Sequence, residues 1–216
     1  MGGLAIAVAA AHAWSLPNAA GIFAGSRDIG VTRPGSTSFD AAGGTYSITG
    51  GGADLWGAAD AFRFAWKSQV GDAALSASVQ FPAGAHPPNE KAVLMFRQSL
   101  DPASRYADVA IHADGHITLQ WRAVDGGQTD DITAEQHAAG SGPTELRIER
   151  HGAVYEAYAA GPDGKMTKFA SAVIAMHDPL YAGLGVCAHD AEGTATIKFS
   201  EVRLKGLPPQ ITVANP

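Results

Sequence analysis

Short segments that alternate apolar and polar residues, separated by glycine-containing turns, constrain the fold of this chain most strongly. The clearest examples are residues 93–99, 106–112 and 117–122, with Asp114-Gly115 between the last two. Successive side chains of a β-strand point to opposite faces, so each segment has one apolar side and one polar side. Glycine supplies the positive φ that tight turns need. Regularly spaced strands with such turns predict an all-β sandwich or barrel.

The same turn chemistry recurs along the chain. We expect turns at the following places: Gly43-Gly44, Gly50-Gly51-Gly52, Asp125-Gly126-Gly127, His151-Gly152 and Asp163-Gly164. In the segment 181–189, Gly183 and Gly185 lie on the second face of the strand. Because they carry no side chain, this part of the surface is flat, which allows a ligand or another chain to approach the backbone closely.

Size and composition agree with one such domain. The chain has 216 residues, of which 17% are charged, and a formal net charge of −6. An all-β domain of this length is common as a single unit, and we place it at residues 26–206. The excess of acidic over basic residues argues against a protein that binds the phosphate backbone of a nucleic acid, because such binding needs clustered Lys and Arg. The single cysteine excludes a disulfide framework.

Two interpretations stay open for the N-terminal residues 1–25. The apolar run 4–13 ends in Ala11-His12-Ala13, which resembles a signal peptide with its cleavage site, although no Lys or Arg precedes Arg27. This interpretation predicts a periplasmic or extracellular protein; a plain apolar leader or first strand predicts a cytoplasmic one. No segment approaches the ~20 apolar residues of a transmembrane helix. We expect residues 207–216 to form a flexible tail.

The polar face of the predicted sheet holds the candidate ligand-binding residues. They are planar, hydrogen-bonding or stacking groups rather than ordinary solvated ones. The candidates are Arg97, Tyr106, Asp108, His112, Gln120, Arg122 and His189. The alternative is a structural network of ion pairs, in which Asp108 lies between Arg97 and Arg122 on adjacent strands.

Several longer stretches, in this order and spacing, resemble one known family. They are residues 51–57, 60–66, 91–100, 106–110, 119–122, 146–150 and 181–186. The chain is similar, over residues 26–204, to bacterial domains of unknown function in the concanavalin A-like lectin/glucanase superfamily. These domains are labelled "biopolymer transporter Tol" and often lie beside Tol-type β-propellers. The resemblance implies an antiparallel β-sandwich of the jelly-roll type, a concave sheet face where related lectins hold glycans, and association with a propeller or another surface protein.

An aromatic group near the first of these stretches has two interpretations. Trp56, Phe62, Phe64 and Trp66 could form a platform on which sugars stack, or they could be core residues beside a glycine-rich turn. Because aromatic side chains dominate protein cores, we favour the second interpretation.

The sequence offers few catalytic groups. Glycosidases use two carboxyl groups about 5–9.5 Å apart. Related laminarinases carry them as Glu-x-Asp-x-x-Glu or Glu-x-Asp-x-Glu, and neither pattern occurs here. We interpret Glu145 and Glu149 as members of a surface ion-pair ladder. An enzyme would have to use His112 or Asp108 as general acid or base. Cys187 and His189 share a strand face, but a lone cysteine in a strand is more often a small packed hydrophobe.

Metal binding is a further open question. Eight scattered histidines do not form a transition-metal site. Loop carboxylates suit Ca²⁺, and the candidates for a structural calcium ion are Asp28, Asp54 and Asp190. We expect no other cofactor.

Three functional hypotheses follow from these observations. The first is a non-catalytic module that binds a carbohydrate or cell surface through the polar sheet face. The second is a hydrolase or lyase that acts on a modified saccharide. The third is a structural or protein-interaction domain in which the polar network only stiffens the sheet.

Overall fold

Two seven-stranded antiparallel sheets pack face to face in the computed structural model, which describes residues 21–208 except 85, 136–137 and 139–141. The first sheet runs, in spatial order, β1 (Gly25–Ile29), β6 (Phe62–Gln69), β15 (Leu180–Cys187), β8 (Lys91–Arg97), β9 (Tyr106–His112), β10 (Ile117–Arg122) and β11 (Thr129–Thr133). The all-β sandwich predicted from the sequence is therefore confirmed.

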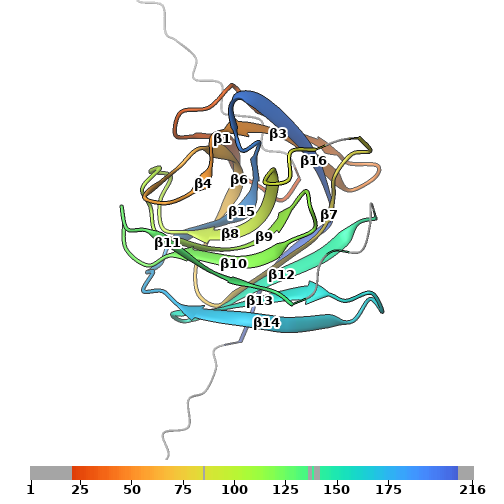
Figure 1. Ribbon diagram of the computed structural model, residues 1–216. Helices are drawn as coiled ribbons and strands as arrows, with labels where there is room; N and C mark the ends of the chain where they lie inside the picture. Colours follow the sequence, from red (N-terminus) through yellow and green to blue (C-terminus); the bar gives the residue numbers. More distant parts are fainter. Residues whose placement is uncertain (1–20, 85, 136–137, 139–141, 209–216) are drawn as a thin grey trace, which may run out of the picture.

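The second sheet packs against the first. Its order is β14 (Met166–Val173), β13 (Val154–Ala160), β12 (Thr144–His151), β7 (Ala73–Gln80), β16 (Asp190–Gly206), β3 (Thr45–Gly52) and β2 (Ser36–Asp40). In Figure 1 the green strands β8–β11 lie above the teal and blue strands β12–β14. A small hairpin of β4 (Leu55–Trp56) and β5 (Ala59–Asp60) completes the structure.

The described strands run from Gly25 to Gly206. Most of the expected leader (residues 1–20) and of the expected tail (residues 209–216) lies outside the described residues. No helix in the described part of the chain is long and apolar enough to cross a membrane.

The main core lies between the two sheets and follows the alternation of the sequence. The first sheet contributes Leu94, Phe96, Val109, Ile111, Ile117 and Leu119, and the second contributes Leu146, Ile148, Ile197 and Phe199, all buried in one cluster. Full burial of one such side chain stabilises the fold by about 1.5–3 kcal/mol. This core also pins the register, because a slip of one residue would turn every apolar side chain to the wrong face.

Most of the predicted turns are confirmed by positive φ angles. They include φ = 92° at Gly115, 70° at Gly126, 60° at Gly152 and 75° at Gly164. The turn predicted at Gly50–Gly52 is wrong, because these residues belong to β3 and pair with β16. Gly50 is a glycine because its backbone lies close to that of Val186, where a Cβ at Gly50 would be 2.2 Å from the Val186 carbonyl oxygen.

A second, smaller core covers part of the outer face of the first sheet. Its buried members are Ile29, Leu55, Phe62, Phe64, Val93, Met95, Tyr106, Ala110 and Cys187. Gly185 makes room for this cluster, because a Cβ there would lie 2.7 Å from Val93 Cγ2 and 2.8 Å from the Phe62 ring. Aromatic rings, rather than a ligand, therefore approach this glycine.

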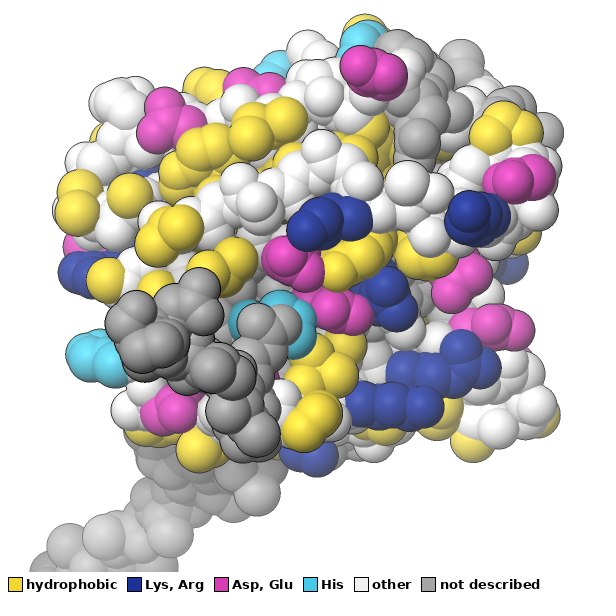
Figure 2. Space-filling model, turned by 90° about the horizontal axis from the view of Figure 1, so that it is seen from below, with side chains coloured by type: hydrophobic (Ala, Val, Ile, Leu, Met, Phe, Trp, Pro, Cys, Tyr) yellow, Lys and Arg dark blue, Asp and Glu magenta, His cyan; other side chains and the backbone are white. Residues whose placement is uncertain are grey.

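The surface away from these cores is mixed in character. On the face seen from below, Figure 2 shows acidic and basic side chains close to one another with hydrophobic side chains between them. Scattered apolar side chains of this kind are ordinary for a protein surface. The outer face of the first sheet is different: the small core covers one part, and the rest is hollowed into the candidate site.

Candidate functional site

Two buried arginines and one aspartate join the β4–β5 hairpin to the first sheet. Arg97 Nη1 donates a hydrogen bond to Asp60 Oδ2 at 2.6 Å. Arg122 reaches the same carboxylate through Nη1 at 2.9 Å and Nη2 at 2.6 Å. Both arginine side chains are 0% exposed. Further N–H groups of the two arginines donate to backbone carbonyls; Arg97 Nε, for example, donates to the Ser99 carbonyl at 2.8 Å. The three charges form one closed ion-pair cluster.

The partner of the two arginines differs from the sequence-based expectation. Asp60 lies between them, whereas neither oxygen of Asp108 has a hydrogen-bond partner among the described residues. Burial raises the pKa of Asp108 well above its usual value, and the positive charge of Lys91 opposes this only in part. Asp108 is fully enclosed and does not line the hollow.

Tyr106 belongs to the same buried region. Its hydroxyl is 3.1 Å from Thr129 Oγ1, and its ring centre lies 5.0 Å from the Arg122 guanidinium. Burial raises the pKa of Tyr106 well above its usual value. Arg97, Tyr106 and Arg122 thus have no exposed surface for the predicted ligand contact, and their visible role is to hold the hairpin in place.

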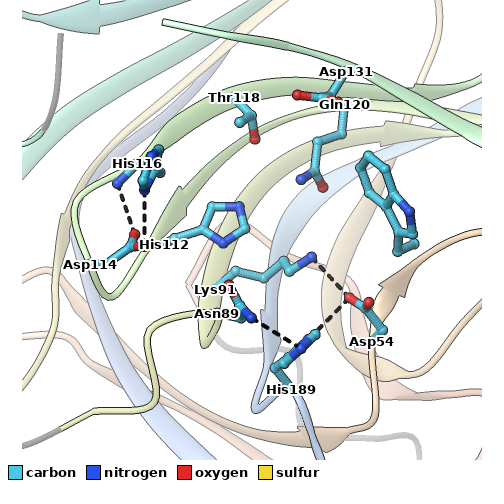
Figure 3. A pocket seen from close by; sticks show the side chains of 11 residues that line it. Asp54, Asn89, Lys91, His112, Asp114, His116, Thr118, Gln120, Asp131 and His189 are labelled. Carbon is cyan, nitrogen blue, oxygen red and sulfur yellow. Dashed lines mark hydrogen bonds and ion pairs between the residues drawn. The ribbon is translucent and has the colours of Figure 1, made fainter.

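A hollow of about 390 Å³ opens beside the hairpin, on the uncovered part of the outer face. Pockets that bind small ligands commonly measure about 300–1,000 Å³. The lining comes from β4, β8–β11 and the segments that flank them, as Figure 3 shows. The lining residues are Asp54, Trp56, Asn89, Lys91, His112, Asp114, His116, Thr118, Gln120, Asp131 and His189.

Three of the predicted ligand-binding residues line this hollow: His112, Gln120 and His189. From the sequence, Asp54 is expected only as a calcium ligand, and most of the other lining residues are not expected in a site. Lys91 and Thr118 continue the alternation of β8 and β10 on the polar side, so the period-two pattern could have found them. Asn89, Asp114 and His116 lie in loops, where no such pattern exists.

One wall of the hollow is a chain of side chains joined by hydrogen bonds and one close histidine–carboxylate contact. Lys91 Nζ donates to Asp54 Oδ1 at 2.9 Å and to the Leu55 carbonyl at 3.3 Å. His189 Nδ1 lies 3.4 Å from the same Asp54 oxygen, and its Nε2 lies 3.4 Å from Asn89 Nδ2. Figure 3 shows the contacts among Lys91, Asp54, His189 and Asn89 as dashed lines. The wall holds the lysine in a fixed position.

The histidines of the hollow have different surroundings. Burial, with a smaller contribution from Lys91, lowers the pKa of His112 to about 4, so its imidazole is neutral at pH 7. His116 Nδ1 lies 2.9 Å from Asp114 Oδ2. Burial alone would raise the pKa of Asp114, but hydrogen bonds from the His116 backbone and ring hold it below its usual value. Asp114 is therefore ionised at pH 7.

Two polar atoms at the floor of the hollow lack partners. Thr118 is 6% exposed and Gln120 is 2% exposed, and neither Thr118 Oγ1 nor Gln120 Oε1 has a hydrogen-bond partner among the described residues. Figure 3 shows both side chains pointing into the hollow. A buried polar group without a partner costs about 1–3 kcal/mol, so native proteins normally supply one. A ligand or ordered water in the hollow would satisfy both.

The four aromatic residues separate into two groups. Phe62 and Phe64 are buried in the smaller core, and Trp66 packs against it. The core interpretation is therefore confirmed for these three. Trp56 is different, because it is 36% exposed and lines the hollow.

Cys187 is a packed side chain. Its Sγ lies 3.5 Å from the Gly52 carbonyl oxygen inside the smaller core. Burial raises the pKa of the thiol to about 11, so the nucleophilic thiolate is scarce at neutral pH.

The acidic pair of β12 lies on the second sheet, away from the hollow. Glu145 is exposed, and Glu149 is 3.2 Å from Arg147 Nε and 3.1 Å from His151 Nε2. Glu149, His151 and Glu156 form the one group of three metal-ligating side chains in the described part of the chain. The Tyr158 hydroxyl lies 2.7 Å from Glu156 Oε2 and 3.3 Å from Glu149 Oε2, so both carboxylates of this group already have polar partners within the protein.

The three calcium candidates have separate partners. The Asp28 carboxylate accepts a hydrogen bond from the Gly35 amide at 3.2 Å, and that of Asp54 accepts one from the Lys91 ammonium. The Asp190 carboxylate accepts a hydrogen bond from the Glu192 amide at 2.9 Å. They form no common ligand set among the described residues. The structural calcium ion therefore stays a prediction without an assigned site.

Comparison with known proteins defines the fold class. The chain has the jelly-roll sandwich of carbohydrate-binding modules and glycoside hydrolases. No family model and no curated protein matches the sequence. A functionally unknown protein from Saccharomyces cerevisiae matches with a TM-score of 0.63, at 17% identity, over 84% of this chain and 97% of that one.

Two further solved structures share this fold. Carbohydrate binding module CBM66 from Bacillus subtilis matches with a TM-score of 0.58, at 15% identity, over 88% of this chain and 100% of that one. A galactohydrolase, named for a substrate of galactose-4-sulfate and anhydrogalactose, has a TM-score of 0.51 at 10% identity, over 82% of this chain and 85% of that one. The Tol label and the bacterial origin stay predictions from the sequence resemblance.

Proposed function

We propose that this protein is a carbohydrate-binding module that holds a saccharide in the hollow between the β4–β5 hairpin and strands β8–β11. The observation that carries the proposal is the pair of buried, unpartnered polar atoms, Thr118 Oγ1 and Gln120 Oε1, beneath an open polar hollow. Sugar hydroxyls both donate and accept hydrogen bonds, so they match a hydroxyl and an amide oxygen.

The rim of the hollow supports the same ligand class. Trp56 is partly exposed there, and an aromatic ring offers a flat apolar surface for the C–H face of a sugar ring. Asn89 is exposed beside His189 and offers an adaptable amide. A hollow with one aromatic surface and several convergent polar groups is typical of small-molecule sites.

The solved structures support the class of ligand through the fold alone. CBM66 is named as a carbohydrate-binding module, and the galactohydrolase is named for a glycan substrate. Because one fold hosts both binding and catalysis, the site residues have to decide between the two.

The chemistry of the hollow favours binding over turnover. Asp108, one of the two catalytic candidates, does not line the hollow. His112 does line it, but a pKa of about 4 makes this imidazole a poor proton acceptor and donor at neutral pH. A hydrolase or lyase remains the second candidate, because His112 is one of several titratable groups that the hollow would offer to a reacting sugar.

The test is a glycan array with the full chain, followed by calorimetry on the glycans that bind and by product analysis for cleavage. We expect Gln120→Ala and Trp56→Ala each to weaken binding by about fivefold, since one hydrogen bond or one stacking contact contributes about 1 kcal/mol. Gln80→Ala is the matched control, because Gln80 is exposed on the second sheet.

Three other outcomes would change the assignment. Cleavage of a bound glycan, lost in His112→Asn, would establish the enzyme. Binding that survives both pocket substitutions would move the site elsewhere. No binding to any glycan would leave the structural or interaction role.

A further inference from the structure

The charges that line the hollow do not balance, and this bears on which saccharides it takes if the proposed function is correct. Three carboxylates line it: Asp54, Asp114 and Asp131. Lys91 is the one lysine among the lining residues, and no arginine is among them. A hollow built for uronates or sulfates would be expected to offer free cationic groups, as protein sites for carboxylates and sulfate-like anions usually do.

Lys91 is already committed to another partner. Its side chain is only 4% exposed, and its ammonium is bound between Asp54 Oδ1 at 2.9 Å and the Leu55 carbonyl at 3.3 Å. An acidic ligand would have to compete with Asp54 for this ammonium, and Asp54 is held in place by the hairpin. The lysine therefore neutralises Asp54 rather than offering a free positive charge.

The histidines do not supply the missing positive charge at pH 7. His112 is neutral there because its pKa is about 4. His116 lies against Asp114 at 2.9 Å, and His189 lies 3.4 Å from Asp54. Any charge that these two rings carry faces a carboxylate of the same hollow.

Asp131 is the lining carboxylate that forms no ion pair with a cationic side chain of the described residues. It lies on β11 directly opposite Gln120, whose amide oxygen is unpartnered at the floor. Its carboxylate accepts a hydrogen bond from Thr133 Oγ1 at 3.2 Å. A ligand bonded to Gln120 would therefore lie beside a negative charge.

We propose that the hollow selects uncharged or amine-bearing saccharides and discriminates against saccharides that carry carboxylate or sulfate groups. Like charges brought together across a binding surface weaken binding and suppress the wrong partners. The fold itself imposes no such preference, because the galactohydrolase with the same fold is named for a sulfated galactan. The lining of this hollow, with Asp131 beside its unpartnered floor, makes the difference.

The experiment compares matched glycan pairs on the full chain at pH 7 and low salt. The probes are methyl-esterified and de-esterified oligogalacturonides, desulfated and sulfated galactan oligosaccharides, and N-acetylated and de-N-acetylated chito-oligosaccharides, added to the array of the proposed function. In the first two pairs, we expect the acidic member to bind at least tenfold more weakly than its uncharged partner. In the third pair, we expect the amine-bearing member to bind at least as tightly as the N-acetylated one. We also expect the difference to shrink as salt is raised.

Asp131→Asn tests the residue directly. It should narrow the gap between acidic and uncharged partners by about two- to fivefold, the range measured for partly exposed charge pairs. Asp130→Asn is the matched control: it changes the net charge equally on the same strand, but Asp130 is the neighbouring residue and points to the other side of the sheet.

The failures are distinguishable. Equal or tighter binding of the acidic partners would overturn this inference and leave the proposed function intact. The same change of selectivity in Asp130→Asn as in Asp131→Asn would also overturn it, because net charge rather than the hollow would then be responsible. If no glycan on the array binds, the proposed function fails and the inference fails with it.

Discussion

Replacement of Asp60 by asparagine should destabilise the protein more than any other single charge removal in the described structure. The asparagine side chain would keep the shape of the aspartate but remove the negative charge that faces two guanidinium groups at 2.6–2.9 Å. Both arginines are fully buried and cannot reach water instead. Removing one partner of a buried ion pair costs about 3–5 kcal/mol, because the other charge stays buried and unpaired.

Urea denaturation at pH 7 measures this effect. With a slope of about 2 kcal/mol per molar urea, a loss of about 4 kcal/mol lowers the midpoint by about 2 M. Asp125→Asn is the matched control, because Asp125 binds Arg105 at the surface, where the two side chains are 56% and 29% exposed. We expect the control to lose no more than about 1 kcal/mol.

A second comparison separates charge from packing. The triple variant Asp60→Leu, Arg97→Met, Arg122→Met removes the whole cluster and should recover much of the lost stability, since apolar replacements of buried ion pairs are often neutral. A loss below about 1 kcal/mol in Asp60→Asn would refute the reasoning. It would mean that water or a rearrangement of the hairpin compensates the two arginines.

Three further predictions concern pH, thiol reactivity and packing. His112 has a folded-state pKa of about 4 against an ordinary value of 6.5, so the unfolded chain binds more protons between these values; stability should fall as pH drops from 6.5 to 4, by about 1–3 kcal/mol. Denaturation curves of His112→Asn should show a smaller drop, and an equal drop would contradict the assignment. Cys187 should resist a thiol reagent in the native protein and react once urea unfolds it, and rapid native labelling would contradict its burial. Gly185→Ala should destabilise the fold by about 1–3 kcal/mol, because its Cβ would overlap Val93 and Phe62, and an unchanged thermal midpoint would show that the smaller core yields.

The local pattern was sufficient for the sandwich and for the face on which the site lies. Leu94, Phe96, Val109 and Ile111 alternate with polar or mixed partners, and in the structure they all face the second sheet. This prediction succeeds because the period of a strand is two, whatever the strand pairs with. The same alternation places His112 and Gln120 on the outer face, where they line the hollow.

The sequence could not show how the outer face is divided. Asp60 is 37 residues from Arg97 and 62 from Arg122, and no local pattern marks it as their partner instead of Asp108. The separation of Trp56 from Phe62 and Phe64 has the same origin. The hairpin places Trp56 at the rim of the hollow, whereas Phe62 and Phe64 are buried in the smaller core.

Strand alternation is a property of neighbouring residues, so the sequence by itself determined the fold class, the core and the polar side of the first sheet. The path of the β4–β5 hairpin depends on long-range contacts, namely one carboxylate that satisfies two distant guanidinium groups. Only the tertiary structure could therefore decide which polar residues are enclosed beneath the hairpin and which line an open hollow. The physical reason is that burial and pairing of charges depend on what lies across the fold rather than on what comes next along the chain.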